Sequence, residues 1–260
     1  MKKTILLTGA TDGIGMHAAA RLAEAGHRLL LHGRNPQKLE AVAASLPSGT
    51  QTYVADLSDL SQVTLLVAAV RRDHERLDVL INNAGVYKTT ATTTSGRDIR
   101  FEVNTLAPWI LTQGLLPRMG PTGRVVNLSS AAQSPVDLDA LAGRKRLGVM
   151  AAYSQSKLAI TAFTRVLAEE HPDGPLFVSV NPGSLLATKM VREGFGVAGK
   201  DVGIGADIVA RAALDPDFEG RSGAYFDNDA GRFDDPHPAV LGPHAHEVTR
   251  AVRELTDGLV

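Results

Sequence analysis

The sequence predicts a single α/β domain built on a parallel, doubly wound sheet with helices on both faces, and three observations carry this prediction. Short runs rich in β-branched residues or leucine alternate with longer helical patterns along the chain. These short runs are continuously apolar, as strands buried on both faces of a sheet require. The chain of 260 residues shows no internal repeat and no Pro/Ser-rich linker, which favours one domain over residues 1–260.

The strands and helices are expected to alternate along most of the chain. The seven or so expected strands cover residues 4–8, 28–32, 51–55, 79–82, 124–128, 177–181 and 224–226. The expected helices cover residues 14–25, 37–45, 60–72, 97–118 and 152–170. The last of these helices ends before Pro172, because proline cannot continue a helix.

Composition and charge exclude several classes of protein. The 27 basic and 28 acidic residues leave a net charge of −1, so the chain has no electrostatic footprint for nucleic acid or an anionic membrane. Cysteine is absent, which excludes disulfides, thiol catalysis and cysteine-ligated metal. No apolar stretch approaches the roughly 20 residues that span a bilayer, and the apolar run after Met1 is too short for a signal peptide. We therefore expect a cytoplasmic protein without a membrane span.

A glycine-rich turn between the first expected strand and helix predicts a dinucleotide site. Gly9 permits the tight turn, Gly13 lets the backbone approach a pyrophosphate, and Gly15 lets helix and strand pack closely. The helix N-terminus adds free amides and a positive dipole for the phosphates. A purely structural turn is the alternative. The other expected cofactor contacts in this segment are Thr11, Asp12 and Ile14.

The residues after the second expected strand favour NADP(H) over NAD(H). An acidic residue at this point would select a free 2′-hydroxyl on the adenosine ribose. The sequence instead has Gly33, which leaves room, and Arg34, whose guanidinium can pair with a 2′-phosphate. A solvated arginine at a helix start is the alternative, and Asp12 adds no positive charge nearby.

The ends of the third and fourth expected strands carry polar residues that could border the cofactor. Asp56, followed by Leu57, could hydrogen-bond adenine, although a carboxylate here could also cap a helix. Asn82 and Asn83 can satisfy backbone groups where strands diverge, and Gly85 allows the cofactor to approach closely. The expected cofactor contacts after the fourth strand are Asn83, Ala84 and Gly85.

Tyr153 and Lys157 are spaced for acid–base chemistry. Four residues make about one helical turn, so both side chains share a helix face. An ammonium beside a phenol favours phenolate and lowers the phenol's pKa, which gives a proton donor and acceptor near neutral pH. The alternative is a solvated helix face, because this spacing also arises by chance.

Two irregular segments, 131–150 and 188–205, lie at the carboxyl ends of expected strands, where open α/β sheets bind ligands. Each is expected to form a substrate loop, with surface variation as the alternative. Residues 194–199 match the Gly-x-Gly-x-x-Gly pattern, but without the flanking strand and helix that give it meaning, so a lid is expected there. The apolar residues that these loops offer a substrate are Leu138, Leu141, Leu147, Met150, Leu185, Met190 and Phe195.

The last quarter of the chain follows no strong pattern and is expected to form a solvated tail. Its histidines, His237, His244 and His246, suggest a metal site. No cysteine accompanies them and prolines interrupt the segment, so no bound metal is expected.

Taken together, these segments resemble the short-chain dehydrogenase/reductase family over about the first three quarters of the chain. The interval 98–112 and the long interval from Ser130 to Tyr153 look like the retinol-dehydrogenase-like branch. The resemblance implies a Rossmann-type fold. The matching pieces, in chain order, are Thr8 to Gly15, Asp56-Leu57, Asn82 to Gly85, Asn104, Ser130, Tyr153 with Lys157, and Pro182-Gly183 followed by Thr188.

The resemblance also implies a role for each matching residue. Tyr153 is the general acid/base toward the carbonyl or alcohol oxygen, and Lys157 lowers its pKa and hydrogen-bonds the nicotinamide ribose. Ser130, rather than Ser129, hydrogen-bonds the reacting oxygen. Asn104 holds a water that links Lys157 to solvent. The residues implied to border the nicotinamide are Pro182, Gly183 and Thr188.

The sequence thus predicts an NADP(H)-dependent oxidoreductase that interconverts an alcohol with a ketone or aldehyde, on an apolar small molecule. Asn104 could instead cap or kink its helix, Ser130 could end a strand, and Thr188 could be an ordinary loop residue. The rival functions are a non-catalytic dinucleotide-binding redox sensor, and an isomerase or dehydratase on the same scaffold. Helices near 105–116 and 156–167 could pack between subunits in a homodimer or homotetramer.

Overall fold

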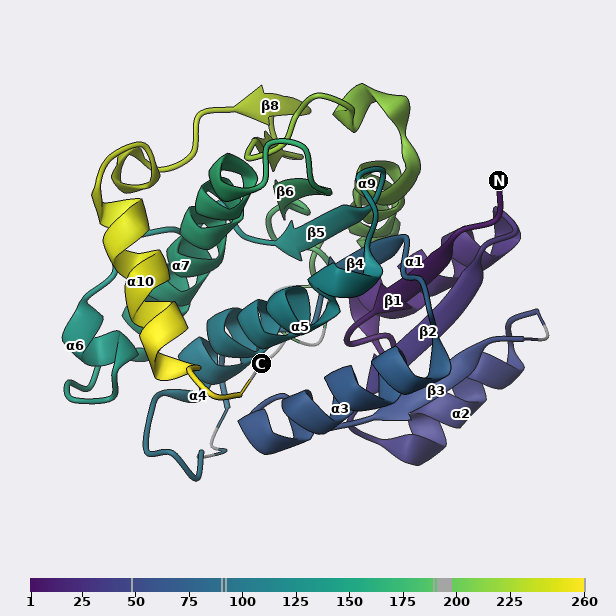
Figure 1. The fold of residues 1–260 in the computed structure, drawn as a ribbon, viewed down its shortest axis with the longest axis horizontal. Coiled ribbons are helices and arrows are strands. Elements are labelled where there is room, and N and C mark those ends of the chain that lie inside the picture. The colour runs from purple at the N-terminus through teal and green to yellow at the C-terminus, as the bar shows by residue number, and fades with distance from the viewer. Residues whose placement is uncertain (48, 90, 92, 189, 191–197, 260) are drawn as a thin grey trace.

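The computed structural model describes residues 1–47, 49–89, 91, 93–188, 190 and 198–259, and it contains one eight-stranded sheet (Figure 1). The strand order is β3-β2-β1-β4-β5-β6-β7-β8, and all neighbours are parallel except the last pair. The strands are β1 Thr4–Leu7, β2 Arg28–Gly33, β3 Gln51–Val54, β4 Val79–Asn82, β5 Arg124–Leu128, β6 Leu176–Asn181, β7 Tyr225–Asp227 and β8 Arg232–Asp234. The predicted doubly wound α/β fold is confirmed.

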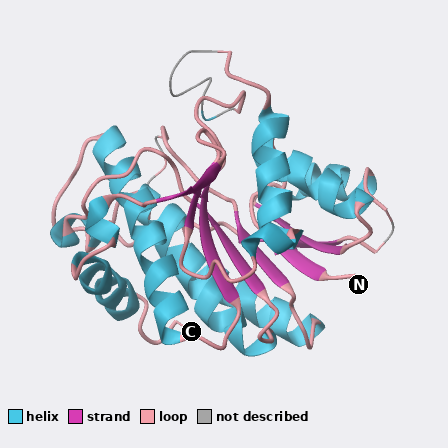
Figure 2. Cartoon of the chain, turned by 90° about the horizontal axis from the view of Figure 1, so that it is seen from above, coloured by secondary structure: helices cyan, strands magenta, loops and turns pink. Residues whose placement is uncertain are grey.

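Helices cover both faces of the sheet (Figure 2). One face packs against α1 Gly13–Glu24, α2 Pro36–Ala44 and α9 Val202–Leu214. The other packs against α3 Leu60–Asp73, α5 Ala107–Leu115 and α7 Val149–Glu170. The chain crosses from β3 to β4 on the far side of β1, so the strand order reverses between β1 and β4. Such a reversal opens a crevice at the carboxyl ends of the strands.

The helix expected over 97–118 is divided into four pieces. These are α4 Ile99–Phe101, a π-helical turn Glu102–Leu106, α5 Ala107–Leu115 and a 3₁₀ turn Leu116–Arg118. Pro108 follows the π-turn and has no backbone N–H to give to the residue four positions earlier, which is Asn104. The wide turn therefore forms around Asn104, and such turns occur often at functional sites.

The strand expected at 224–226 is present as β7, but the expectation of a solvated tail is wrong. The chain beyond β7 forms β8 and α10 His244–Leu255, and α10 lies along the outer side of α7 (Figure 1). Ala245, Val248 and Val252 recur on one face of α10 and are buried. At its far end, Arg253 donates two 2.9 Å hydrogen bonds to Glu170 of α7. Part of the α7 surface is thus covered within the chain itself.

The substrate loops are only partly described. Residues 131–150 contain a short helix, α6 Leu138–Leu141. Residues 191–197 lie outside the described residues, and they include Phe195 and most of the lid expected over 194–199. Among the described residues, no helix combines the length and apolar character needed to cross a membrane. The same residues contain no group of three or more His, Cys, Asp or Glu side chains that could hold a metal ion.

Candidate active site

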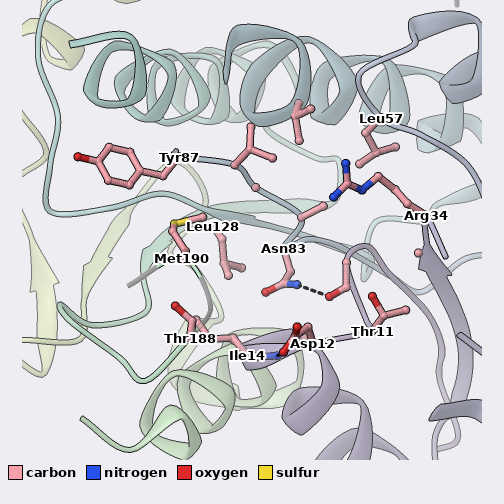
Figure 3. Close-up of a pocket in the computed structure, with 18 of the residues that line it drawn as sticks. Thr11, Asp12, Ile14, Arg34, Leu57, Asn83, Tyr87, Leu128, Thr188 and Met190 are labelled. Atoms are coloured by element: carbon pink, nitrogen blue, oxygen red, sulfur yellow. Dashed lines mark hydrogen bonds between the residues drawn. The ribbon is translucent and has the colours of Figure 1, made fainter. Parts of the chain in front are cut away.

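A cavity of about 920 Å³ opens at the carboxyl edge of the sheet, where the strand order reverses (Figure 3). Its two ends differ, because Arg34 and Leu57 lie at one end and Tyr87 at the other. The predicted site residues that line it are Gly9, Thr11, Asp12, Gly13, Ile14, Gly15, Arg34, Asp56, Leu57, Asn83, Ala84, Gly85, Tyr153, Lys157, Pro182 and Thr188. The predicted residues that do not line it are Asn104, Ser130 and Gly183.

The glycine turn leaves two amides for an anion. Asp12 caps α1, since its carboxylate accepts a 2.8 Å hydrogen bond from the Gly13 amide. The next two amides, of Ile14 and Gly15, have no acceptor among the described residues, although both residues line the cavity. Free amides at the N-terminus of a 12-residue helix form an anion site, which fits a pyrophosphate. Asp12 thus caps the helix beside this site.

Asn83 fastens the glycine turn to β4. Its Nδ2 donates to the Thr8 carbonyl at 2.8 Å and to the Gly9 carbonyl at 3.1 Å. Figure 3 shows Asn83 reaching to the glycine turn. The Thr8 hydroxyl accepts in return from the amides of Asn83 and Ala84, at 3.0 and 3.1 Å. The side chain of Asn83 therefore fixes the backbone of the glycine turn, in line with the expectation that it satisfies backbone groups where the strands diverge.

The end of the cavity near β2 carries two cations. Arg34 and Lys38 are exposed, line the cavity, and have no carboxylate partner among the described residues. They lie four residues apart across the first turn of α2, which Asn35 caps by accepting a 2.8 Å bond from the Lys38 amide. Sequence reasoning missed Lys38, although its spacing from Arg34 was visible. Asp56 also lines this end, and its Oδ1 accepts from the amide and hydroxyl of Ser58 as a turn cap.

His32 is a buried imidazole at this end of the cavity, and its position makes stability depend on pH. Its Nδ1 accepts from the Gly9 amide at 3.4 Å, so Nε2 carries the proton and donates to the Ala55 carbonyl at 3.0 Å. Burial lowers the pKa of His32 to about 4. In the unfolded chain an ordinary histidine takes up a proton below about pH 6.5. The free energy of unfolding should therefore fall as pH drops from about 6.5 to about 4.

We expect His32 to contribute about 2–3 kcal/mol to this loss between pH 7 and pH 4.5. Urea unfolding of the wild type and of His32→Gln at both pH values measures it. The substitution should lower the free energy of unfolding at pH 7 and reduce the difference in that free energy between pH 7 and pH 4.5. Equal changes in the two proteins would contradict the prediction, and the other histidines, present in both, serve as the internal control.

Tyr153 and Lys157 project from one face of α7, and the Lys157 Nζ lies 5.9 Å from the Tyr153 ring centroid. Nζ donates a 2.7 Å hydrogen bond to the Leu128 carbonyl at the end of β5. Burial lowers the pKa of Lys157 to about 8. Burial also raises the pKa of the Tyr153 phenol, so the expected lowering of that pKa by Lys157 is wrong for this structure.

Two adjacent serines face different partners. The Ser129 hydroxyl is buried and bonds the Lys157 carbonyl, at 3.1 Å, and the Thr161 hydroxyl, at 2.7 Å. The Ser130 side chain instead lies beside the Tyr153 phenol, and its interaction with that phenol lowers the pKa of Tyr153 against the larger effect of burial. Ser129 therefore holds α7 against β5, while Ser130 touches the group that would transfer a proton.

The Asn104 side chain joins the loop after β4 to α7 through hydrogen bonds. Its Oδ1 accepts from the Val86 amide at 2.8 Å, and its Nδ2 donates to the Val86 carbonyl and the Ser156 hydroxyl, both at 3.0 Å. A Cβ on Gly85 would sit 3.4 Å from Asn104 Oδ1 and 3.5 Å from Lys157 Nζ. The carboxamide oxygen and the ammonium thus border the same small space beside Gly85, where the oxygen keeps one lone pair for a further donor.

The substrate end of the cavity differs from the expectation. Met190 lines it, but Leu138, Leu141 and Leu147 pack into the core instead. Met150 and Leu185 are exposed and lie outside the lining. The residues that sequence reasoning missed at this end are Val86, Tyr87, Lys88, Leu128 and Val149. None of them belongs to a motif, so only the folded chain identifies them.

The turn at Pro182-Gly183 is held from outside by the β7–β8 turn. Gly183 has a φ of +118°, which favours glycine. Asn228 Nδ2 donates to the Pro182 carbonyl at 2.9 Å, and the Asp229 carboxylate accepts from the Ser184 amide and hydroxyl. These braces place Thr188 against the glycine turn, with its Cγ2 3.4 Å from the site of a Cβ on Gly13.

Comparison with known proteins gives a consistent result. Residues 3–195 match the sequence model of the short chain dehydrogenase family. Human retinol dehydrogenase 13 is 33% identical over 227 residues, covering 83% of this chain and 66% of that protein. Mouse retinol dehydrogenase 12 is 34% identical over 244 residues, covering 86% and 77%. A crystal structure described as a short chain dehydrogenase from Escherichia coli CFT073, complexed with NADPH, superposes with a TM-score of 0.71 at 28% identity, covering 87% of this chain and 96% of that one.

Proposed function

Because the chain belongs to the short-chain dehydrogenase family, whose members act on alcohol and carbonyl groups with NAD(P), we propose that it is an NADP(H)-dependent oxidoreductase of apolar ketones or aldehydes and their alcohols. One observation carries the proposal. Tyr153 and Lys157 line the same cavity as the unpaired amides of α1, and Ser130 lies beside the Tyr153 phenol. Proton transfer and dinucleotide binding are thereby joined in one space.

The chain's own residues would position the carbonyl and supply its proton. The Tyr153 hydroxyl donates to the carbonyl oxygen during reduction, and the Ser130 side chain stabilises the charge that develops there. The Lys157 ammonium sits behind them, anchored on the Leu128 carbonyl, and would hold the nicotinamide ribose. The bound nicotinamide supplies the hydride. In the oxidation direction Tyr153 accepts the proton, which requires the phenolate to be favoured against the effect of burial.

The residues present fit the whole cofactor. The amides of Ile14 and Gly15 suit the pyrophosphate, and Pro182 and Thr188, which also line the cavity, would border the nicotinamide. The cations Arg34 and Lys38 suit a 2′-phosphate, and this is the support for NADP(H) over NAD(H).

The test is consumption of NADPH with a panel of apolar aldehydes and ketones, followed by absorbance at 340 nm. We expect oxidation of NADPH coupled one-to-one to alcohol formation. Cofactor binding without turnover of any carbonyl would support the redox sensor instead. A product formed without net NADPH consumption would support the isomerase or dehydratase.

Removal of the two cations should change cofactor choice. We expect Arg34→Ala and Lys38→Ala each to raise the KM for NADPH by about 10- to 100-fold, because each removes a charge-assisted bond to the 2′-phosphate. The KM for NADH should change less than threefold. Arg250→Ala, on α10 away from the cavity, is the matched control. Equal losses for NADPH and NADH would show that the cations do not recognise the phosphate.

The remaining proposals concern partners and location. The substrate is a small molecule, and the protein is proposed to work in the cytoplasm. A homodimer or homotetramer would have to leave α10 in place on α7, so its contact would use another part of that layer. Light scattering during size-exclusion chromatography measures the oligomeric state directly.

A further inference from the structure

The aromatic ring of Tyr87 lines the cavity (Figure 3), as does Tyr153, the proposed proton donor. Its ring centroid lies 5.1 Å from that of Tyr153, and the two planes meet at 66°, an edge-to-face contact. Tyr87 is 7% exposed and lines the cavity at the end opposite Arg34. A carbonyl bonded to the Tyr153 hydroxyl would thus have its substituents within reach of the Tyr87 ring.

The backbone around Tyr87 is fixed by two side chains of the helix that follows. Arg100 Nε donates a 2.7 Å hydrogen bond to the Tyr87 carbonyl, while Asn104 binds both backbone groups of Val86. Arg100 is buried, and its Nη1 binds both carboxylate oxygens of Asp98, at 2.9 and 3.0 Å. Arg100 and Asn104 are four residues apart and reach back to consecutive residues of the loop after β4. Tyr87 is therefore presented as a rigid wall.

The residues that line the cavity near Tyr87 are mixed in character. Val86, Val149 and Met190 are apolar, while Lys88 and Thr89, which follow Tyr87 in the chain, line the cavity as well. The carboxylates among the described lining residues, Asp12 and Asp56, both belong to the nucleotide end. A thioether and an aromatic ring favour contact with flat, electron-rich groups more than with saturated rings of the same size.

We propose that Tyr87 is a specificity-determining residue that selects planar aromatic or conjugated carbonyl substrates. The flat part of the substrate packs on the Tyr87 ring while its carbonyl oxygen receives the proton of Tyr153. This inference rests on the proposed function and adds to it a substrate class and the residue that recognises it. The Tyr87 ring carries the selection.

The test compares acetophenone with cyclohexyl methyl ketone, which have the same skeleton and differ in the aromaticity of one ring. We expect Tyr87→Phe to keep the wild-type ratio of kcat/KM for the two ketones within about twofold. Tyr87→Leu and Tyr87→Met should lower that ratio by about three- to tenfold. This is the fold-change that corresponds to the interaction free energy of one aromatic pair. The intrinsic reactivity of each ketone cancels when variant and wild type are compared. The KM for NADPH should stay unchanged in all three variants.

Several results would overturn the inference. An unchanged ratio in both Tyr87→Leu and Tyr87→Met would show that the ring does not select substrates. An equal loss on both ketones would show that Tyr87 only positions Tyr153. A wild type that reduces cyclohexyl methyl ketone but not acetophenone would refute the inference and leave the proposed function standing. A wild type that reduces no ketone or aldehyde would remove the proposed function and this inference with it. Thermal unfolding of each variant identifies a misfolded protein. Because leucine and methionine differ in shape, the test can still be made if one of the two variants does not fold.

Discussion

Tyr153→Phe should lower kcat for carbonyl reduction by about 10²- to 10⁴-fold, which is the usual rate enhancement that a positioned proton donor contributes. The substitution removes one oxygen and keeps the ring, so the edge-to-face contact with Tyr87 and the fold of α7 should survive. The Ser130 hydroxyl loses its contact with the phenol but still accepts a 3.1 Å hydrogen bond from the Ala132 amide. Loss of turnover should therefore occur without loss of the cavity. Single-turnover reduction with saturating NADPH measures the step directly.

The dissociation constant for NADPH, from quenching of protein fluorescence, should stay within about threefold of the wild-type value, because the phosphate contacts lie at the glycine turn. Tyr53→Phe is the matched control. It removes a phenol oxygen that bonds Asp73, at 3.1 Å, and His74, at 2.9 Å, away from the cavity. That variant should lose some stability and keep its kcat. Retention of wild-type kcat by Tyr153→Phe would refute the mechanism.

The pattern of strands could be predicted because each buried strand carries its signal in adjacent residues. β4 and β5 are buried throughout, have apolar residues at their centres, and were located with their observed bounds. β8 and α10 were missed for a physical reason. β8 has three residues, two of them charged, and α10 buries few apolar side chains beneath a polar surface. Such elements form because a neighbouring surface is already in place.

The helix α9 was not predicted from the sequence because glycines occupy its first turn. The sequence VGIG at its start has low helix propensity and lies in a segment expected to be a loop. Gly205 is needed there because a Cβ would lie 2.5 Å from the Leu186 side chain and 3.1 Å from that of Ile14. Close packing of α9 on α1 thus requires a residue that local propensity disfavours. Tertiary packing overrides propensity at this position.

The candidate site could be predicted where spacing alone determines geometry. The interval from Tyr153 to Lys157 places both side chains at one cavity, and the glycine turn lies where a strand meets a helix. The pKa direction of Tyr153 could not be predicted in this way. It depends on how much protein surrounds the phenol, and burial is the largest influence on this pKa. Tyr87 could not be predicted either, since its position depends on bonds from Arg100 and Asn104.

Gly15→Ala should damage both stability and cofactor binding. A Cβ at this position would lie 2.1 Å from the Gly9 carbonyl oxygen and 2.6 Å from Asn83 Nδ2, far inside van der Waals contact. Backbone has to move, because the closest atom belongs to the main chain of the glycine turn. Either α1 moves away from β1, or Asn83 loses its bonds to the Thr8 and Gly9 carbonyls. Both movements displace the free amides of Ile14 and Gly15.

We expect Gly15→Ala to cost about 1–3 kcal/mol of unfolding free energy, the usual range for overpacking a tight contact, and to lower Tm by several degrees. NADPH affinity should fall by at least about tenfold, since the two amides no longer converge on one anion. Gly120→Ala is the matched control, because a Cβ there would meet no atom within 4 Å. Calorimetry gives Tm, and fluorescence titration gives the dissociation constant. A Gly15→Ala protein that binds NADPH within twofold of the wild type would show that the glycine turn does not hold the pyrophosphate.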